Sequence, residues 1–187
     1  RTATGLRHAR MKTPPDKAPV FGKYMIIAAW VLALALLTMF FNDQLDRQRN
    51  PNRQLKTATD GTLPVVRLQR NRFGHYVATG AINDEPVEFM LDTGATDVSV
   101  PADVADRLGL VRGQRAVYQT ANGPITVWRT SIDEIRLGPI RVGPVSASIN
   151  PHDSTEAVLL GMSFLRALDF NQQGNTLTLS YPRPGGN

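Results

Sequence analysis

An uncharged apolar run of 18 residues, Tyr24 to Phe41, restricts the fold of this chain more than any other stretch. As a helix rising about 1.5 Å per residue it spans roughly 27 Å, close to the thickness of a bilayer core. A buried core helix would show a polar face, and this run has none. A cleaved signal sequence remains an alternative, but the run is long for one and no small-residue cleavage site follows it. We therefore expect one uncleaved transmembrane helix at residues 24–41.

The segments on either side of this run are polar. Residues 1–23 form a basic N-terminal segment in which Met11 is a candidate start residue, so residues 1–10 are left out of the fold reasoning. Residues 42–62 show no apolar periodicity and are expected to form a polar stalk. The positive charges before the run favour a cytoplasmic N-terminus only when residues 1–10 are counted, and we expect this orientation for a short N-terminal anchor followed by a long domain. We therefore expect a single-pass protein of the inner (cell) membrane, with residues 63–187 as a periplasmic domain.

The formal net charge of +5 is distributed unevenly along the chain. Residues 1–62 hold 10 Lys and Arg against 4 Asp and Glu, a net of +6, whereas residues 63–187 hold 11 against 12, a net of −1. The basic character thus belongs to the N-terminal third, and we expect no nucleic-acid partner for the domain. Because the chain contains no cysteine, disulfides and thiolate metal sites are excluded.

From Leu63 onward, short apolar runs typical of strands alternate with turn residues. The runs cover residues 65–70, 75–82, 87–91, 98–101, 116–121, 125–132, 140–149, 157–161 and 177–181. The stretches 83–86 and 122–123 carry turn signals, and helical periodicity is confined to residues 102–110 and 163–170. The pattern predicts an all-β domain, a small closed β-barrel with one or two short helices.

A carboxylate follows directly on one of these apolar runs. Asp92 comes after Phe89-Met90-Leu91 and begins the tripeptide Asp-Thr-Gly. A charge at the end of a buried strand must be hydrogen-bonded, paired or functional, because an unpaired buried charge costs several kcal/mol. A purely structural turn at the strand end would also use Asp-Thr-Gly, so the tripeptide alone leaves both interpretations open.

Three motifs in order decide between them: "FMLDTGAT" at residues 89–96, "YQTANGPITV" at 118–127 and "VLLGMSFL" at 158–165. With them, residues 65–181 resemble the retropepsin-like aspartic proteases, and among these a membrane-anchored, single-domain bacterial group. The resemblance implies a retropepsin-like acid-protease barrel and an aspartic endopeptidase activity without a cofactor or a metal. Its substrate would be a protein or peptide.

The resemblance also implies a role for individual residues. Asp92 would be the catalytic carboxylate. Thr93, Gly94 and Ala95 would support the active-site loop, with Thr93 interlocking the loops of two subunits, and the strand ending at Leu160-Gly161 would cross behind it. Residues 118–125 would form a flap over the substrate, with Thr120, Ala121, Asn122 and Gly123 at or near its tip.

The chemistry of this class requires two carboxylates that share a proton. This chain has one Asp-Thr-Gly motif, since no other Asp precedes Thr-Gly or Ser-Gly. The second carboxylate is therefore expected from a second copy, in a symmetric homodimer with the active site on its axis. The alternative is a non-catalytic interaction module that binds peptide on the same fold.

Other candidate residues receive ordinary explanations. The histidines His8, His75 and His152 lie far apart in the sequence and lack metal-ligand spacing. Ser163 lacks the following glycine of a nucleophile elbow and is expected to cap a helix. A phosphoaspartate loop at Asp92 is disfavoured because the charged neighbours of such sites are missing. Trp128 is expected to pack on a strand, with substrate contact as the alternative.

Overall fold

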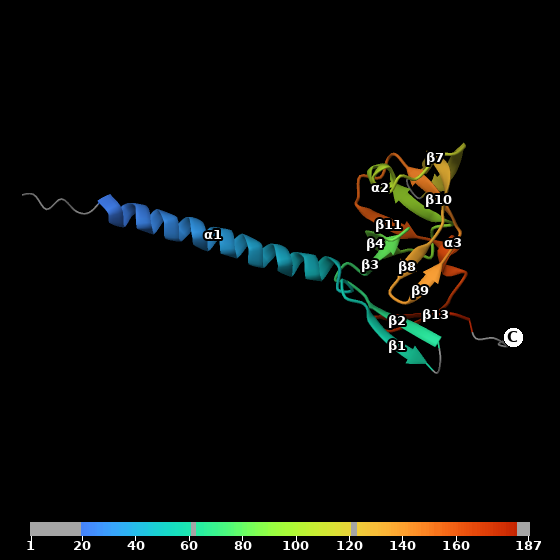
Figure 1. Cartoon of the computed structure of the whole chain (residues 1–187), viewed down its shortest axis with the longest axis horizontal. Coiled ribbons are helices and arrows are strands. Elements are labelled where there is room, and N and C mark those ends of the chain that lie inside the picture. The colour runs from blue at the N-terminus through green and yellow to red at the C-terminus, as the bar shows by residue number, and fades with distance from the viewer. Residues whose placement is uncertain (1–19, 61–62, 121–122, 183–187) are drawn as a thin grey trace, which may run out of the picture. The chain divides into compact units, whose positions relative to one another are not determined.

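The computed structural model describes residues 20–60, 63–120 and 123–182 of the chain. The chain divides into two compact units, residues 1–42 and residues 43–187, which are described separately. In Figure 1 the colour follows the chain from blue at helix α1 to red at the last strand, β13. Apart from α1, helix in the described residues is limited to two short segments, and the β strands dominate the second unit.

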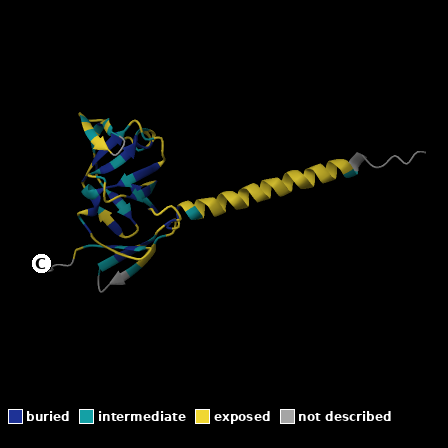
Figure 2. Cartoon of the chain, turned by 180° about the vertical axis from the view of Figure 1, so that it is seen from behind, coloured by how far each residue is buried: buried dark blue, intermediate teal, exposed yellow. Residues whose placement is uncertain are grey.

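Helix α1 (Val20–Arg49) is one continuous segment of 30 residues. Its side chains from Tyr24 to Phe41 are exposed, as Figure 2 shows in yellow, so the expectation that this run is not a buried core helix is confirmed. By length and composition the helix is able to cross a membrane. It then continues through the polar residues 42–49, which were expected to belong to a stalk.

Nine strands form the larger of two sheets, in the order β6-β7-β10-β5-β11-β4-β3-β8-β9. Their bounds are β3 (Tyr76–Ile82), β4 (Glu85–Leu91), β5 (Val98–Pro101), β6 (Arg115–Thr120), β7 (Gly123–Ile132), β8 (Ile135–Leu137), β9 (Ile140–Val142), β10 (Val145–Asn150) and β11 (Ala157–Leu160). The parallel pairing of β4 with β11 brings Leu91 opposite Leu160 and so aligns the ends of these two strands. This alignment places the residues that follow them side by side.

The hairpin of β3 and β4 has the turn that its sequence predicts. Asn83 and Asp84 have φ values of 48° and 69°, which a two-residue type I′ turn requires and which Asn and Asp tolerate. The register pairs Ile82 with Glu85 and runs without interruption to Tyr76 and Leu91. The turn therefore fixes the register of the two strands, and the register decides which side chains of β4 face the core.

The smaller sheet has four strands in the order β1-β2-β13-β12. Their bounds are β1 (Lys56–Asp60), β2 (Leu63–Gln69), β12 (Asp169–Gln173) and β13 (Thr176–Ser180). Side chains on one face, such as Val66, Leu68 and Leu179, are fully buried and belong to the same core as Phe89 and Ile135 of the larger sheet. The two sheets thus share a single hydrophobic core.

Two short helices complete the second unit, α2 (Ala102–Arg107) and α3 (Met162–Leu165). Helix α3 is shorter than the predicted segment 163–170, because Asp169 and Phe170 belong to β12. The predicted strand 140–149 is divided into β9 and β10 at Gly143–Pro144. The expected mostly-β fold with short helices is confirmed, although its hydrogen bonds divide the strands between two sheets.

The segment expected as a stalk is different in the structure. Residues 56–60 form β1 and pair with β2, so the predicted boundary at residue 63 falls inside a sheet. Asn50 and Asn52 are each only 3% exposed. The amide of Asn52 donates to the carbonyls of Gln69 (2.9 Å) and Val77 (2.7 Å), and its oxygen accepts the Gln69 N–H (2.7 Å). Hydropathy misses this segment because its buried side chains are polar and hydrogen-bonded.

Candidate active site

Asp92 is the first residue after β4, at the aligned ends of β4 and β11. Its N–H donates to the Leu160 carbonyl (3.1 Å), which extends the pairing of the two strands by one residue. One carboxylate oxygen, Oδ1, accepts the N–H of Gly94 at 2.8 Å, and the Asp92 carbonyl accepts the Ala95 N–H at 3.3 Å. The carboxylate is held by its own turn, the residue is exposed, and Oδ2 has no hydrogen-bond partner among the described residues.

The neighbours of Asp92 are the small and polar residues that the motif predicts. Thr93 and Gly94 are exposed and Ala95 is half-buried. A Cβ atom added at Gly94 would lie 3.2 Å from Asp92 Oδ1, so a side chain there would crowd the carboxylate. Gly94, which has no side chain, therefore keeps the carboxylate accessible. Within the described part of the chain, the Thr93 hydroxyl makes no hydrogen bond.

Gly161 lies directly behind the loop that follows Asp92. A Cβ atom at Gly161 would overlap the Asp97 carbonyl oxygen and lie 2.6 Å from that of Ala95. The following N–H groups of Met162 and Ser163 donate to the carbonyls of Ala95 (2.9 Å) and Thr96 (3.0 Å). The loop is thus bonded to the start of α3 across a contact that only glycine permits. Leu160 and Gly161 lie where the sequence predicted the crossing strand.

The predicted flap is the hairpin of β6 and β7, whose register runs from Arg115 opposite Trp128 to Thr120 opposite Gly123. Gly123 has a φ of 105°, which favours glycine, and the Thr120 hydroxyl donates to its carbonyl at 2.8 Å. The predicted tip residues Ala121 and Asn122 lie outside the described residues. The structure therefore supports a hairpin here and describes it up to its last pair.

Asp97 connects this hairpin to the Asp92 loop, a contact that was missed from the sequence. Its Oδ2 accepts the Tyr118 hydroxyl at 2.8 Å, and its Oδ1 accepts the Ser148 hydroxyl at 3.3 Å. Burial, followed by the Asp97 carboxylate, raises the pKa of the Tyr118 hydroxyl above its ordinary value. The only signal in the sequence was proximity, since Asp97 follows Asp92 by five residues.

The other candidate residues are also placed by the structure. Ser163 does not cap α3, whose N-cap is Gly161; its hydroxyl accepts the Val98 N–H (3.0 Å) and donates to the Ser146 carbonyl (2.8 Å). Trp128 packs against the core and lies beside the guanidinium groups of Arg112 and Arg115, which confirms the packing interpretation. In the ranges 20–60, 63–120 and 123–182, no group of three or more His, Asp or Glu is arranged to hold a metal ion.

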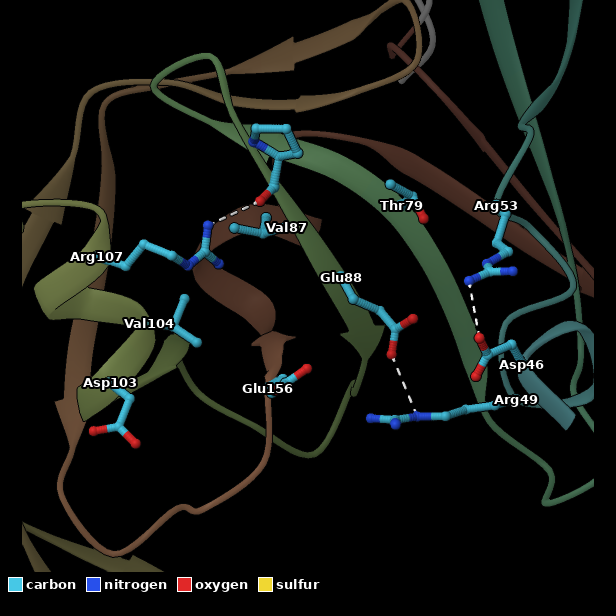
Figure 3. Close-up of a pocket in the computed structure, with 11 residues that line it drawn as sticks. Asp46, Arg49, Arg53, Thr79, Val87, Glu88, Asp103, Val104, Arg107 and Glu156 are labelled. Atoms are coloured by element: carbon cyan, nitrogen blue, oxygen red, sulfur yellow. Dashed lines mark hydrogen bonds and ion pairs between the residues drawn. The ribbon is translucent and has the colours of Figure 1, made fainter. Parts of the chain in front are cut away.

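A cavity of about 750 Å³ lies elsewhere on the second unit, and none of its lining residues belongs to the loop from Asp92 to Asp97. Figure 3 shows its charged walls. Arg49 points at Glu88 (3.5 Å) and Arg53 at Asp46 (3.2 Å). Arg107 donates to the Pro86 carbonyl at 3.3 Å. Most of its charges are satisfied within the chain, and we assign the cavity no ligand.

Comparisons with known proteins agree with this site. Residues 78–167, which include the Asp92 loop, the hairpin and Gly161, match the family described as gag-polyprotein putative aspartyl protease. The crystal structure of a retropepsin-like aspartic protease from Rickettsia conorii is similar with a TM-score of 0.55 and 25% identity. That similarity covers 68% of this chain and 96% of the other. The β unit of this chain is therefore similar in sequence and in fold to the retropepsin-like aspartic proteases.

Two curated relatives are similar to this chain over stretches longer than the family match at residues 78–167. An uncharacterized protein encoded in the cobV 5′ region of Sinorhizobium sp is 26% identical over 159 residues, which cover 78% of this chain and 68% of that protein. An uncharacterized protein of Rickettsia prowazekii is 29% identical over 121 residues, or 61% of this chain. The matched region spans half the length of the Rickettsia prowazekii protein.

Proposed function

We propose that this chain is a membrane-anchored aspartic endopeptidase that hydrolyses peptide bonds as a homodimer, with Asp92 of each subunit forming the catalytic pair. The observation that carries this proposal is the geometry of Asp92. Its carboxylate belongs to an exposed residue at the end of two aligned strands and is fixed through one oxygen by Gly94, while the other oxygen has no hydrogen-bond partner in the described residues. A carboxylate held in this way is positioned for acid–base chemistry on a bound water.

In the proposed reaction, one Asp92 carboxylate accepts a proton from a water as the water attacks the scissile carbonyl. The Asp92 of the partner subunit, protonated, donates a hydrogen bond to the carbonyl oxygen. Two carboxylates held close together cannot both ionise cheaply, so the pair retains one proton and titrates as a unit. Gly94 supports this role because a side chain there would crowd the carboxylate oxygen.

Two features of the single chain support a second copy at the site. Asp92 and Thr93 are both exposed, although the pair chemistry needs a site shielded from bulk water. The resemblance assigns Thr93 to contacts between the active-site loops of two subunits. A partner placed with two-fold symmetry over this loop would cover both residues and supply the second carboxylate.

The open edge of the smaller sheet is a candidate contact for that partner. β12 is the last strand of the sheet and all five of its residues are exposed. Phe170 is 43% exposed, although it continues the row of Leu179 and Val66, which are both fully buried. Antiparallel pairing of two β12 strands about Asn171 would place Asp169 opposite Gln173 and no like charges together. Such pairing would extend the sheet and cover Phe170.

Helix α1 supports the proposed anchor. It is long and apolar enough to cross a membrane once, and its apolar side chains are exposed. With a cytoplasmic N-terminus, the β unit would act on proteins or peptides on the periplasmic side of the inner membrane. Tethering to one membrane would also favour the dimer, because it raises the local concentration of subunits.

The proposal is tested by Asp92→Asn in the full chain, purified in detergent and incubated with a peptide library whose new N-termini are mapped by mass spectrometry. The amide keeps the shape of the carboxylate but cannot exchange a proton, so we expect cleavage to fall by about 10²-fold or more. Asp103→Asn, which changes an exposed Asp with no hydrogen-bond or ion-pair partner in the described residues, is the matched control and should cleave like wild type. Peptide binding by wild type without any cleavage would contradict the enzyme and favour a binding module.

A further inference from the structure

The hairpin of β6 and β7 lies at one end of the nine-stranded sheet, and its two strands are held unequally. β7 pairs with β6 on one side and with β10 on the other, whereas β6 pairs with β7 alone among the described strands. A strand with a single neighbour is the part of a sheet that opens most readily. Side-chain contacts from β6 to the body of the domain therefore matter for the position of the hairpin.

Tyr118 makes such a contact. It is half-buried, and its hydroxyl donates to Asp97 Oδ2 at 2.8 Å. Tyr118 is two residues before Thr120, the last residue of β6, which corresponds to about 7 Å along the strand. The bond thus holds the outer strand near the end of the described hairpin. A contact at this place restricts the movement of that end more than a contact near the base of the hairpin would.

Asp97 is a rigid partner for this bond. Its carbonyl packs against Gly161, and its second carboxylate oxygen accepts the hydroxyl of Ser148, which is buried on β10. The main chain and the side chain of Asp97 are therefore both fixed. Asp97 also belongs to the loop that begins at Asp92, so the Tyr118 bond connects the hairpin to the segment that carries the catalytic carboxylate.

The raised pKa of Tyr118 keeps its hydroxyl protonated, so that it is able to donate the hydrogen bond to Asp97. Burial raises the pKa of its hydroxyl, and the carboxylate of Asp97 raises this pKa further, while Arg129 acts in the opposite direction. The hydroxyl therefore stays protonated at every pH below the ordinary pKa of tyrosine and can donate the hydrogen bond to Asp97 throughout that range. A hydrogen bond from a hydroxyl to a carboxylate is also stronger than one between neutral groups.

We propose that Tyr118 and Asp97 are positioning residues that clasp the β6–β7 hairpin to the Asp92 loop and so hold the hairpin in place over a substrate bound at Asp92. The inference rests on the proposed function, because it assigns the clasp to substrate binding at the same site. With the clasp formed, the hairpin is ordered before the substrate arrives. Without it, the substrate must order the hairpin on binding, which weakens binding more than it slows the chemical step.

Hydrogen exchange of the hairpin amides, measured by mass spectrometry on the full chain in detergent, tests this clasp alongside peptidase kinetics. In Tyr118→Phe we expect exchange in residues 115–120 and 123–128 to quicken about three- to tenfold, since one charge-assisted bond is lost. KM should rise by a similar factor and kcat should change less. Tyr181→Phe removes a tyrosine hydroxyl bonded to Arg141 and is the matched control.

Two changes at Asp97 separate the clasp from a general effect on folding. Asp97→Asn keeps an acceptor oxygen for Tyr118 but loses the charge, so its exchange should lie between wild type and Tyr118→Phe, whereas Asp97→Ala should exchange at least as fast as Tyr118→Phe. Exchange and KM of Tyr118→Phe equal to those of Tyr181→Phe would overturn the clasp. If wild type cleaves no peptide, the proposed function fails, and the exchange rates still decide whether Tyr118 holds the hairpin.

Discussion

Gly94 lies in the loop that begins at Asp92, and Gly161 lies behind this loop. A side chain at each position would meet different atoms. At Gly161 a side chain would meet the main-chain oxygens of Ala95 and Asp97, and the loop that carries them is bonded to the start of α3 through Ala95 and Thr96. At Gly94 it would meet only the side-chain oxygen of Asp92. One glycine is therefore needed to assemble the site, and the other to keep its carboxylate accessible.

This difference predicts opposite outcomes for two alanine substitutions. Gly161→Ala should lower the free energy of unfolding by about 1–3 kcal/mol, because the loop must move away from α3. Gly94→Ala should keep nearly wild-type stability but reduce kcat, because the new methyl crowds Asp92 Oδ1. Thermal unfolding and peptidase rates of the two variants check this. Equal loss of stability in both would contradict the account of Gly161.

At the scale of elements, the segment between α1 and β1 is a structural part of the β unit. Asn50 donates to the Thr79 hydroxyl (3.1 Å) and to Glu88 (3.0 Å), the residue of β4 that also faces Arg49. Asn52 joins β2 to β3 through three hydrogen bonds. The strand that carries Asp92 is thus supported by residues that lie before the first strand.

We predict that Asn52→Ala lowers the free energy of unfolding of the β unit by about 2–3 kcal/mol, because it leaves buried main-chain groups without partners. Gln54→Ala, an exposed position two residues further on, should have no measurable effect. Thermal unfolding of both variants in detergent provides the comparison. Indistinguishable unfolding of the two would mean that the segment behaves as the loose stalk expected from its composition.

The elements predicted from the sequence are those with local signals. Strand β4, the Asn83–Asp84 turn and the helix after Pro101 follow from apolar runs and turn residues. β1, β8 and β12 were missed because they are short or polar, and β12, with the sequence DFNQQ, shows no alternation. Asp92 and Gly161 were found through their motifs. The bond between Tyr118 and Asp97 joins segments that are brought together only by the tertiary structure, so no local sequence pattern predicts it.

At the scale of the whole molecule, the proposed active site requires two chains. Each chain contributes one Asp-Thr-Gly loop, one hairpin and one open β12 edge, and each carries its own apolar helix. In the proposed function, anchoring would restrict both subunits to the same membrane and so would favour pairing over dissociation. The catalytic unit would then be the pair, and a single chain would be inactive however well it folds.

The most direct test of this claim is the activity of a mixed dimer. A wild-type chain and an Asp92→Asn chain with different tags are coexpressed, purified in detergent over both tags in turn, and assayed for peptide cleavage. The control is a wild-type pair with the same two tags. Because a carboxylate and an amide cannot exchange the roles of base and acid, we expect the mixed dimer to be slower than the control by about 10²-fold or more. A mixed dimer with about half the control rate would show that each subunit acts alone, and would contradict the shared pair.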